Sequence, residues 1–359
     1  MKNLEFPIVG TKVKVLSEKF DINSPVGRKK YYAAKVGDEI SHIKKYLKKG
    51  NTFVAYMLGK KNSGKGTYTK IISEIFGEDK IAHISVGDLI REIDDWESFS
   101  KTKRHDRMKK YYRGYVSWDA AVDAHLGRSQ SKLLPDEFTL SLLKAHIDEL
   151  QGKCLFLDGL PRNLDQVSYS LFFRDLVNYR EDPDIFVLID IPESVIAERI
   201  KYRVVCPICK TSRNRKLLVS SKIEYDDKEK EFYLLCDNPD CTGNGKTRMV
   251  GKQGDELGLE PIRERLNNDE DLLRETFNLH GVPKILMRNH VPVAESGKYF
   301  DDYEITPEYG YIWDAKREKV VVTEKPWTIK DDNGVKCYSL LAAPVVVSFI
   351  KQLMDVLDL

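Results

Sequence analysis

Residues 59–67 read GKKNSGKGT, and this stretch decides the fold of the chain. It follows an apolar run, residues 52–58 (TFVAYML), and precedes a segment of helical pattern, residues 68–76. In the order strand, glycine-rich loop and helix, the free N–H groups of the loop and of the first helical turn can surround phosphate oxygens. Lys65 would reach the terminal phosphates as a point charge. The stretch therefore predicts a nucleotide-binding loop.

The residues after the lysine narrow the class of nucleotide-binding protein. In the general phosphate-binding loop a Ser or Thr follows the lysine directly, whereas here Gly66 intervenes before Thr67. The ending GKGT resembles the loop of the adenylate kinase family of nucleoside monophosphate kinases. The resemblance implies that ATP is bound by Gly59, Ser63, Gly64, Lys65, Gly66 and Thr67.

Length and composition indicate a soluble globular chain of one large domain or two to three small ones. The chain has 359 residues, of which 42% are hydrophobic and 32% charged, and its formal net charge is +2. So small a charge gives no global attraction to nucleic acid or membranes. The longest apolar stretch, residues 340–350, is too short to span a bilayer, and the N-terminus has no signal-peptide core. We expect a cytoplasmic monomer with no membrane or nucleic-acid partner.

Strand-like and helical segments alternate from Asn51 onward. Helical segments separate the strand candidates, and a last helix is expected over residues 344–357. This order predicts an α/β fold with a parallel sheet and right-handed crossovers. The strand candidates are short apolar runs, typical of strands buried on both faces, at residues 52–58, 81–86, 154–158 and 185–191.

Two segments lie outside this alternation. Residues 1–50 carry twelve Lys or Arg against five Asp or Glu. The apolar spacing from Val36 to Leu47 predicts an amphipathic helix that docks before the first core strand, and we favour a solvated basic face over a nucleic-acid arm. Within residues 295–341, strand-like runs separated by AKREK and DDNG predict an inserted antiparallel β-meander.

A second constellation, LFLDGLPRNLDQ, covers residues 155–166. Asp158 ends a buried strand, where a protein of this class holds Mg²⁺ directly or through water. Arg162 would extend into the crevice, where an unpaired Arg is costly unless an anion arrives. Taken alone, a turn with an ion pair explains the segment equally well.

The same segment resembles the DGFPR…Q motif of the adenylate kinase family, with Leu160 in place of the aromatic residue. The resemblance implies that Arg162 binds the phosphate of the acceptor and that Gln166 reads its adenine. Relatives directed to CMP or UMP have Asn at this position, so Gln166 favours AMP as the acceptor.

A third segment, ISVGDLIR, covers residues 84–91. It is similar to the family's STGD-x-x-R, in which Arg91 would face the same phosphate as Arg162. Asp88 near a helix start is by itself no more than a favourable cap. Val86 stands where the family usually has a Thr in contact with the acceptor base, which leaves the identity of that base open.

The resemblance places the lobe that binds the acceptor over residues 85–150. SKLLPDEF, residues 131–138 with Leu134, resembles the family's GKLVTDEL, which lies along the acceptor base. The preceding residues 101–130 contain basic KTKRHDRMKK and aromatic YYRGY. Such interleaving can bind single-stranded nucleic acid, but we favour a solvated helix with a few core aromatic residues.

Arginines follow on two further segments. Arg199 and Arg203 are four residues apart on one helical face, where they repel unless an anion such as a phosphate chain lies between them. Two solvent-facing arginines are the alternative. Their stretch resembles the family's DVP…R…R, which implies that both close on the transferring phosphoryl group. Residues 254–266, GDELGLEPIRERL, resemble DD…E…R-x-R-L, which implies that Arg263 and Arg265 are directed to phosphate.

Four of the six cysteines form two close pairs, CPIC and CDNPDC. Both spacings occur among the ligands of tetrahedral Zn²⁺ sites, and disulfides are disfavoured in a cytoplasmic protein. A site of four Cys leaves no open position, so the metal would be structural. The pairs lie where the family has its lid, here expected over residues 204–258. We predict one Zn²⁺ bound by Cys206, Cys209, Cys236 and Cys241.

Together the motifs predict a P-loop kinase with a parallel sheet core, an acceptor-binding lobe, a zinc-bearing lid and an added β-meander. The core is expected in residues 51–84, 151–203 and 259–359. The resemblance implies reversible transfer of the γ-phosphoryl group of Mg-ATP to AMP, giving two ADP. Two alternatives stay open: a kinase for CMP, UMP or GMP, and a zinc-containing nucleic-acid-binding protein with a vestigial nucleotide pocket. The expected catalytic residues are Lys65, Asp158, Arg162, Arg199, Arg203 and Arg265, and the expected acceptor-binding residues are Val86, Arg91, Leu134, Arg162, Gln166 and Arg263.

Overall fold

A parallel five-stranded sheet forms the centre of the computed structural model, which describes residues 1–13, 18–127, 136–161, 182–218 and 222–359. The strand order is β10-β4-β1-β3-β2, and all neighbouring strands are parallel. The four predicted strands are confirmed, and β10 is an edge strand that the sequence analysis missed. The strands are β1 (Val54–Gly59), β2 (Ile81–Ser85), β3 (Cys154–Asp158), β4 (Asp184–Asp190) and β10 (Lys284–Arg288).

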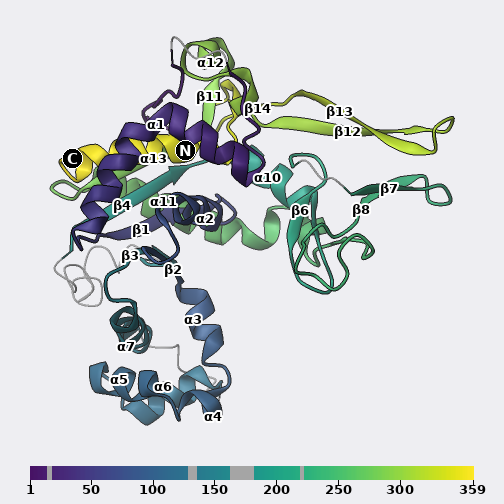
Figure 1. Ribbon diagram of the computed structural model, residues 1–359. Coiled ribbons are helices and arrows are strands. Elements are labelled where there is room, and N and C mark those ends of the chain that lie inside the picture. The colour runs from purple at the N-terminus through teal and green to yellow at the C-terminus, as the bar shows by residue number, and fades with distance from the viewer. Residues whose placement is uncertain (14–17, 128–135, 162–181, 219–221) are drawn as a thin grey trace.

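Helices cover both faces of this sheet (Figure 1). Because side chains alternate along a strand, Met57 packs into one apolar cluster and its neighbours Tyr56 and Leu58 into the other. Both faces are apolar, which explains the continuous apolar runs of the strands. The first face is covered by α1 (Pro25–Lys48), α2 (Lys65–Phe76) and α13 (Ala342–Val356), and the second by α3 (Val86–Glu92), α7 (Asp136–Ile147) and α11 (Arg263–Asn278).

A helical lobe follows β2. Trp96, Trp118 and Phe138 pack at its centre, with the Trp118 and Phe138 ring centroids 5.7 Å apart. On its surface Arg104 pairs with Glu149 at 2.6 Å. Trp118 of the stretch 101–127 is thus a core residue and Arg104 is a paired surface charge, whereas Tyr115 is exposed. Besides α3 and α7 the lobe contains α4 (Trp96–Phe99), α5 (Lys103–Tyr111), α6 (Trp118–His125) and the 3₁₀ turn η1 (Asp148–Leu150).

The lid projects from the core after α10 (Glu193–Lys201). It contains a three-stranded sheet of order β6-β5-β9 and a separate hairpin, β7–β8. The first of these strands, β5, begins at Arg203, one residue before the stretch predicted for the lid. Two 3₁₀ turns, η2 (Asp255–Leu257) and η3 (Glu260–Ile262), lead back to α11. The strands are β5 (Arg203–Val205), β6 (Ser212–Asn214), β7 (Ile223–Asp226), β8 (Glu231–Leu234) and β9 (Val250–Gly251).

The chain between β10 and α13 differs in one respect from the predicted meander. Its strands are antiparallel, but they form a two-stranded hairpin, β12–β13, and a separate three-stranded sheet of order β11-β15-β14. Only Trp327 lies between β13 and β14, too little for a hairpin turn, so β14 leaves the first sheet. The elements are β11 (His290–Pro292), α12 (Val293–Tyr299), η4 (Asp302–Glu304), β12 (Pro307–Asp314), β13 (Lys319–Pro326), β14 (Thr328–Lys330) and β15 (Lys336–Ser339).

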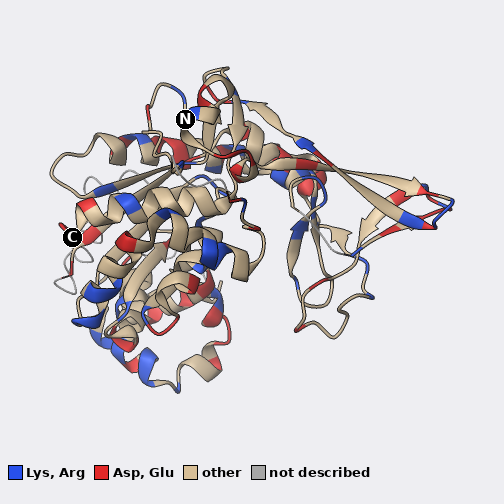
Figure 2. Cartoon of the chain, turned by 45° about the horizontal axis from the view of Figure 1, so that its top comes forward, with Lys and Arg blue, Asp and Glu red and all other residues tan. Residues whose placement is uncertain are grey.

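The predicted N-terminal amphipathic helix is α1. Its apolar side chains, including Tyr31, Ile43 and Leu47, pack into the cluster shared with α2 and α13. Figure 2 shows charges of both signs interspersed along the chain, including at the tips of the hairpins β7–β8 and β12–β13. In the part of the chain that the structure describes, no helix is both long and apolar enough to cross a membrane.

Candidate active site

The glycine-rich loop joins β1 to α2 as the sequence predicts. Lys65, the first residue of α2, donates from Nζ to the Gly59 carbonyl at 2.7 Å, and Nζ lies 3.7 Å from Asp158 Oδ1. Gly64 has a φ of +105°, and an added Cβ would lie 3.2 Å from the Tyr68 ring. The first N–H groups of α2 have no acceptor within the helix. Loop and helix therefore offer donors and a cation beside one carboxylate, a suitable arrangement for a phosphate chain and its metal ion.

A cleft of about 750 Å³, here called the central cleft, opens at the carboxyl ends of β1, β2 and β3. Five predicted site residues from four segments of the chain line it, namely Gly59, Lys65, Arg91, Asp158 and Arg265. The crevice at the carboxyl ends of parallel strands is where open α/β folds bind ligands. The sequence motifs thus converge on one space, which has both the charge and the volume for phosphorylated ligands.

Three predicted site residues, Leu134, Arg162 and Gln166, lie outside the described part of the chain. Asp158, Gly159 and Pro161, which lead to Arg162, line the central cleft. The described residues that directly precede Arg162 therefore lie at the central cleft.

Val86 and Arg91 occupy different positions in α3. The Ser85 hydroxyl caps the helix by accepting from the Asp88 N–H at 3.3 Å. Arg91 pairs with Asp88 at the cleft, and its side chain is largely exposed. Val86 is 1% exposed, packs in the core and is not among the described residues that line the central cleft. The Thr-to-Val difference from the family thus lies beneath the cleft surface.

Helix α11 contributes an acidic group that the sequence analysis missed. Asp269 lines the central cleft, and its Oδ2 accepts from the Lys61 N–H at 2.8 Å. Burial raises the pKa of Asp269, and the positive charges of Lys65 and Arg265 only partly offset this effect. Arg265 and Asp269 are four residues apart, which places them on one helical face. This four-residue spacing from Arg265 is the sequence signal that could have identified Asp269.

Arg263 and Arg265 diverge, although both were predicted to face phosphate. Residues two apart on an α-helix point about 200° away from each other. Arg265 lines the central cleft, whereas Arg263 Nη1 pairs with Glu193 Oε2 at 2.6 Å, at the start of α10. The structure thus brings Arg265, and not Arg263, to Lys65.

Arg199 lies on the other side of the glycine-rich loop. Its Nη1 donates to the carbonyls of Asn62 at 2.9 Å and Ser63 at 3.2 Å. It lines a pocket of about 370 Å³, here called the Arg199 pocket, together with Thr67. The segment between β10 and α13, residues 289–341, is here called the inserted segment. It supplies another wall of this pocket through Trp327, Leu340 and neighbouring residues. The sequence analysis gave this segment no part in the site.

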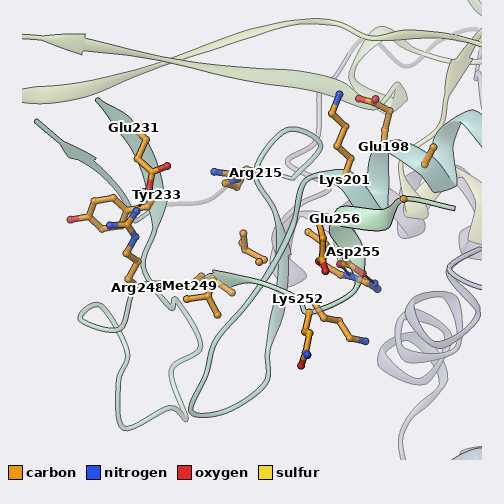
Figure 3. A pocket seen from close by; sticks show the side chains of 17 residues that line it. Glu198, Lys201, Arg215, Glu231, Tyr233, Arg248, Met249, Lys252, Asp255 and Glu256 are labelled. Carbon is orange, nitrogen blue, oxygen red and sulfur yellow. Dashed lines mark hydrogen bonds and ion pairs between the residues drawn. The ribbon is translucent and has the colours of Figure 1, made fainter. Parts of the chain in front are cut away.

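Arg203 stands where the lid leaves the core. It donates to both carboxylate oxygens of Asp255, from Nε at 2.6 Å and from Nη2 at 2.5 Å. It lines the Arg199 pocket and also a third cavity of about 710 Å³ under the lid. Figure 3 shows that basic and acidic side chains, among them Lys201, Arg248 and Glu256, surround this third cavity. Arg203 therefore connects the glycine-rich loop with the lid.

The four predicted zinc ligands come together in the lid. The Sγ atoms of Cys206 and Cys241 are 3.8 Å apart and those of Cys209 and Cys236 are 3.7 Å apart, and all four lie within 4.8 Å of one another. A tetrahedral site with Zn–S bonds of about 2.3 Å requires sulfur atoms about 3.8 Å apart. The donor set and its spacing therefore fit Zn²⁺.

Comparison with known proteins gives a consistent result. No family model matches the chain. An adenylate kinase of Thermotoga petrophila is 31% identical over 215 residues, which are 59% of this chain and 79% of the relative. One from Thermotoga neapolitana is 29% identical over 238 residues, 66% of this chain and 89% of the relative. A mitochondrial GTP:AMP phosphotransferase of Drosophila melanogaster is 29% identical over 151 residues, 42% of this chain and 56% of the relative.

The names of these relatives agree with the kinase class that the glycine-rich loop, the central cleft and the parallel sheet indicate. The identity to the Thermotoga petrophila protein extends over most of that protein's length. The chain therefore belongs to the adenylate kinase family and is a phosphotransferase of the nucleoside monophosphate kinase class.

Proposed function

We propose that this enzyme reversibly transfers the γ-phosphoryl group of Mg-ATP to AMP, giving two ADP. The observation that carries the proposal is the central cleft, where Lys65, Asp158, Arg91 and Arg265 meet. In this assignment AMP enters from the side of Arg91, and ATP lies over the glycine-rich loop with its base toward the Arg199 pocket. The transferring group would lie between them, beside Lys65.

The reaction needs little covalent help from the protein. The acceptor is a phosphate oxygen that is already anionic, so no general base is required. Positioning and charge neutralisation supply the catalysis. Lys65, Arg162, Arg199, Arg203 and Arg265 are the groups proposed to surround the transferring phosphoryl group, and Asp158 would hold Mg²⁺ directly or through water. Arg263 keeps its proposed role in substrate binding, but it pairs with Glu193 and does not line the central cleft.

The lid is proposed to close over the nucleotides. Closure excludes water and so suppresses hydrolysis of ATP. Arg203, bound to Asp255 at the base of the lid, would then exchange a carboxylate for a phosphate. A structural Zn²⁺ held by the four lid cysteines would keep the lid folded as one unit during this movement.

AMP is the proposed acceptor for two reasons. Gln166 offers a donor and an acceptor to the edge of adenine, and a site built on such a pair rejects bases that leave it unpaired. The relatives' names, adenylate kinase and GTP:AMP phosphotransferase, also share AMP. Val86, whose departure from the family's Thr left the identity of the acceptor base open, is buried beneath the cleft. The hydroxyl that this Val lacks would contribute at most about 1 kcal/mol to binding.

A coupled assay of the purified protein tests the acceptor. With ATP, kcat/KM should be highest for AMP among AMP, CMP, UMP and GMP, and Gln166→Asn should reduce the ratio of AMP to CMP. Gln151→Asn, in an exposed turn after α7, is the matched control and should leave this ratio unchanged. If CMP, UMP or GMP is the better acceptor in the wild type, the base assignment is wrong although the kinase class stands.

The donor has one second candidate, GTP, because one relative is named a GTP:AMP phosphotransferase. The same assay with GTP in place of ATP decides between the two donors. The nucleic-acid alternative has no comparable support, since Arg104 on the basic stretch already pairs with Glu92 and Glu149.

A further inference from the structure

Three side chains of kinds that can bind metals come together in the segment between β10 and α13, far from the lid cysteines in sequence. His290 lies on β11, Cys337 on the neighbouring strand β15, and Asp331 in the turn between β14 and β15. One ligand atom from each lies within 4.8 Å of the others. The phosphoryl-transfer site proposed above uses none of the three.

The distances resemble the edges of a metal site more than hydrogen bonds. His290 Nε2 lies 3.7 Å and Cys337 Sγ 3.8 Å from Asp331 Oδ2. A nitrogen and an oxygen 3.7 Å apart are too distant for a hydrogen bond. Tetrahedral Zn²⁺ with bonds of about 2.1 Å to N and O and 2.3 Å to S would separate these atoms by about 3.4–3.6 Å. A movement of a few tenths of an ångström would therefore admit the ion.

The cluster is buried and incompletely hydrogen-bonded. His290 is 3% exposed and Cys337 0%. His290 Nδ1, on the side of the ring away from Asp331, is buried without a hydrogen-bond partner, and Nε2, which faces Asp331 Oδ2 at 3.7 Å, is the nitrogen that could bind a metal. A neutral imidazole that carries its proton on Nδ1 can offer the Nε2 lone pair to a metal.

Neighbouring groups orient the side chains of the cluster. Asp331 Oδ1 accepts from the N–H groups of Asn333 at 3.0 Å and Val335 at 2.8 Å, which fixes the carboxylate and leaves Oδ2 facing His290 and Cys337. Asp190 Oδ2 lies 3.9 Å from His290 Nδ1, on the side of the ring away from Asp331. Metal-bound histidines usually donate this second N–H to a carboxylate, a backbone carbonyl or water, and Asp190 would have to approach by about 1 Å to accept it.

The net charge near the cluster is close to balanced. Arg288 and the Met1 amino group contribute positive charge, and Asp190 and Asp332 contribute negative charge alongside Asp331. The Cys337 thiol is a weak donor to Asp331 Oδ2, and a cation bound between them would take the place of that proton.

We propose that His290, Asp331 and Cys337 form a second metal site, for Zn²⁺ or a similar borderline divalent ion, separate from the lid cysteines. Nitrogen, oxygen and sulfur donors together suit such an ion. Three side chains leave the fourth tetrahedral position to water.

This site would connect the inserted sheet to the glycine-rich loop. Asp332, next to the ligand Asp331, accepts from the Glu193 N–H at 2.9 Å and lies 3.4 Å from the ammonium of Lys60 in the loop. A metal that fixes Asp331 therefore also fixes the turn that contacts the loop. Loss of the metal should raise KM for the nucleotide donor more than it lowers kcat.

Metal analysis of the full chain tests the proposal. The wild type should contain about two Zn²⁺ per chain, Cys337→Ser about one, and the lid variant Cys206→Ser/Cys209→Ser about one. Cys154→Ser, at another fully buried cysteine, is the matched control and should keep two. A wild type with one Zn²⁺ and Cys337→Ser with none would support this site and reject the lid site. A wild type and Cys337→Ser with the same metal content would overturn the proposal.

Cobalt spectroscopy provides a readout that does not depend on whether Cys337→Ser folds. In the lid variant, added Co²⁺ should give the absorption bands of a tetrahedral ion with one thiolate ligand. His290→Gln in the same background should abolish these bands. A lid variant that is folded by circular dichroism and gives only the spectrum of aqueous Co²⁺ would overturn the proposal, with Cys337 then acting as a weak donor to Asp331.

Discussion

Lys65 occupies a position that a merely structural lysine would not take. Its ammonium lies between the Gly59 carbonyl and Asp158 and lines the open central cleft. Among the described residues its hydrogen-bond acceptors are the Gly59 carbonyl and, at a long 3.5 Å, the Lys60 carbonyl, while Asp158 at 3.7 Å lies beyond hydrogen-bond distance. The remaining donor capacity faces the space assigned to the transferring phosphoryl group.

Replacing Lys65 with Met should abolish phosphoryl transfer and leave the fold intact. Removing a charge that stabilises the transition state typically costs several kcal/mol, which corresponds to at least a hundredfold in kcat. The coupled assay measures the rate, and circular dichroism measures the fold. Lys70→Met, exposed on the same helix, should retain full activity. Turnover of Lys65→Met within tenfold of the wild type would remove Lys65 from the catalytic role.

Lys60 serves the loop differently, because its side chain is 1% exposed. Its Nζ lies 2.6 Å from Glu270, 3.4 Å from Glu193 and 3.4 Å from Asp332. These carboxylates come from α11, α10 and the inserted segment. Lys60 therefore holds the glycine-rich loop to three separate parts of the chain.

Lys60→Met should reduce the free energy of unfolding by about 2 kcal/mol. The substitution leaves three carboxylates without their common cation, and solvent reaches them partly, so the loss is smaller than for a fully buried pair. Urea denaturation measures the change. Lys80→Met, whose lysine forms an exposed pair with Asp79, should change stability by less than about 0.5 kcal/mol. Equal values for the two variants would contradict the role of Lys60.

Sequence reasoning found Lys65 and Asp158 but not Lys60 or Asp269. The first two stand in motifs whose spacing carries the information. The partners of Lys60 lie between 133 and 272 residues away, and only the folded chain brings them together. Asp269 resembles any acidic residue on an amphipathic helix until its position beside Arg265 in the cleft is known.

Among the elements, the lid is organised around its four cysteines. A small apolar cluster of Val204, Leu234 and Met249 surrounds the cysteines. Such a cluster is small for a folded unit, and units of this size usually depend on a metal or a disulfide.

Chelation of Zn²⁺ should therefore melt the lid before the core. In the lid, metal binding and folding are coupled locally. Hydrogen exchange should show lost protection in β5, β6 and β9, while the amides of β1 and β4 remain protected. Cys206→Ser should reproduce this pattern without a chelator. A lid that exchanges equally slowly with and without metal would exclude a structural role for the ion.

The inserted hairpin β12–β13 lies beside the lid hairpin β7–β8 (Figure 1). The ring of Trp313 stacks on that of Tyr225 with centroids 5.1 Å apart. The Tyr311 hydroxyl donates to the Arg215 carbonyl at 2.5 Å, and the Tyr309 N–H donates to the Lys216 carbonyl at 2.8 Å. Movement of the lid must carry the inserted hairpin with it or break these contacts.

A double-mutant cycle measures this contact. Tyr225→Ala and Trp313→Ala should show a coupling energy of about 1 kcal/mol in the stability of the lid, as expected for an aromatic pair. Tyr225→Ala combined with Tyr115→Ala, at an exposed residue of the helical lobe, should be additive. Additivity of the first pair would show that the two hairpins do not stabilise each other.

At the level of elements, the sequence indicated which residues form strands better than it indicated which strands pair with each other. The runs that form β12, β13 and β15 were recognised, because alternation and turn residues are local signals, whereas the short strand β14 was missed. These strands divide into two sheets because Trp327 alone connects β13 to β14, and a single residue is too short a connection for another hairpin. The missed strand β10 has the same apolar character as β4, but it lies beyond the segment that resembles the family.

In the whole molecule, the chain before the glycine-rich loop belongs to the same core as the sheet. The α1 side chains pack with α2 and α13 over one face of the sheet. The Tyr31 hydroxyl also donates at 2.5 Å to Glu304 of the inserted segment, and Lys35 pairs with Asp301 at 2.7 Å. The two segments that the family motifs do not cover are therefore attached to each other as well as to the core.

Ile43→Ala should consequently destabilise the entire protein and not merely detach a terminal helix. Ile43 is 0% exposed, and truncation of a buried Ile typically costs about 3 kcal/mol through lost burial and the cavity left behind. If α1 is part of one cooperative unit, urea unfolding followed by far-UV circular dichroism and by near-UV signals should shift together by this amount. Val26→Ala, 71% exposed on the same helix, should shift neither. A transition in which α1 unfolds first, with the sheet signal unchanged, would mean that the amphipathic helix is an accessory to the kinase core and not part of it.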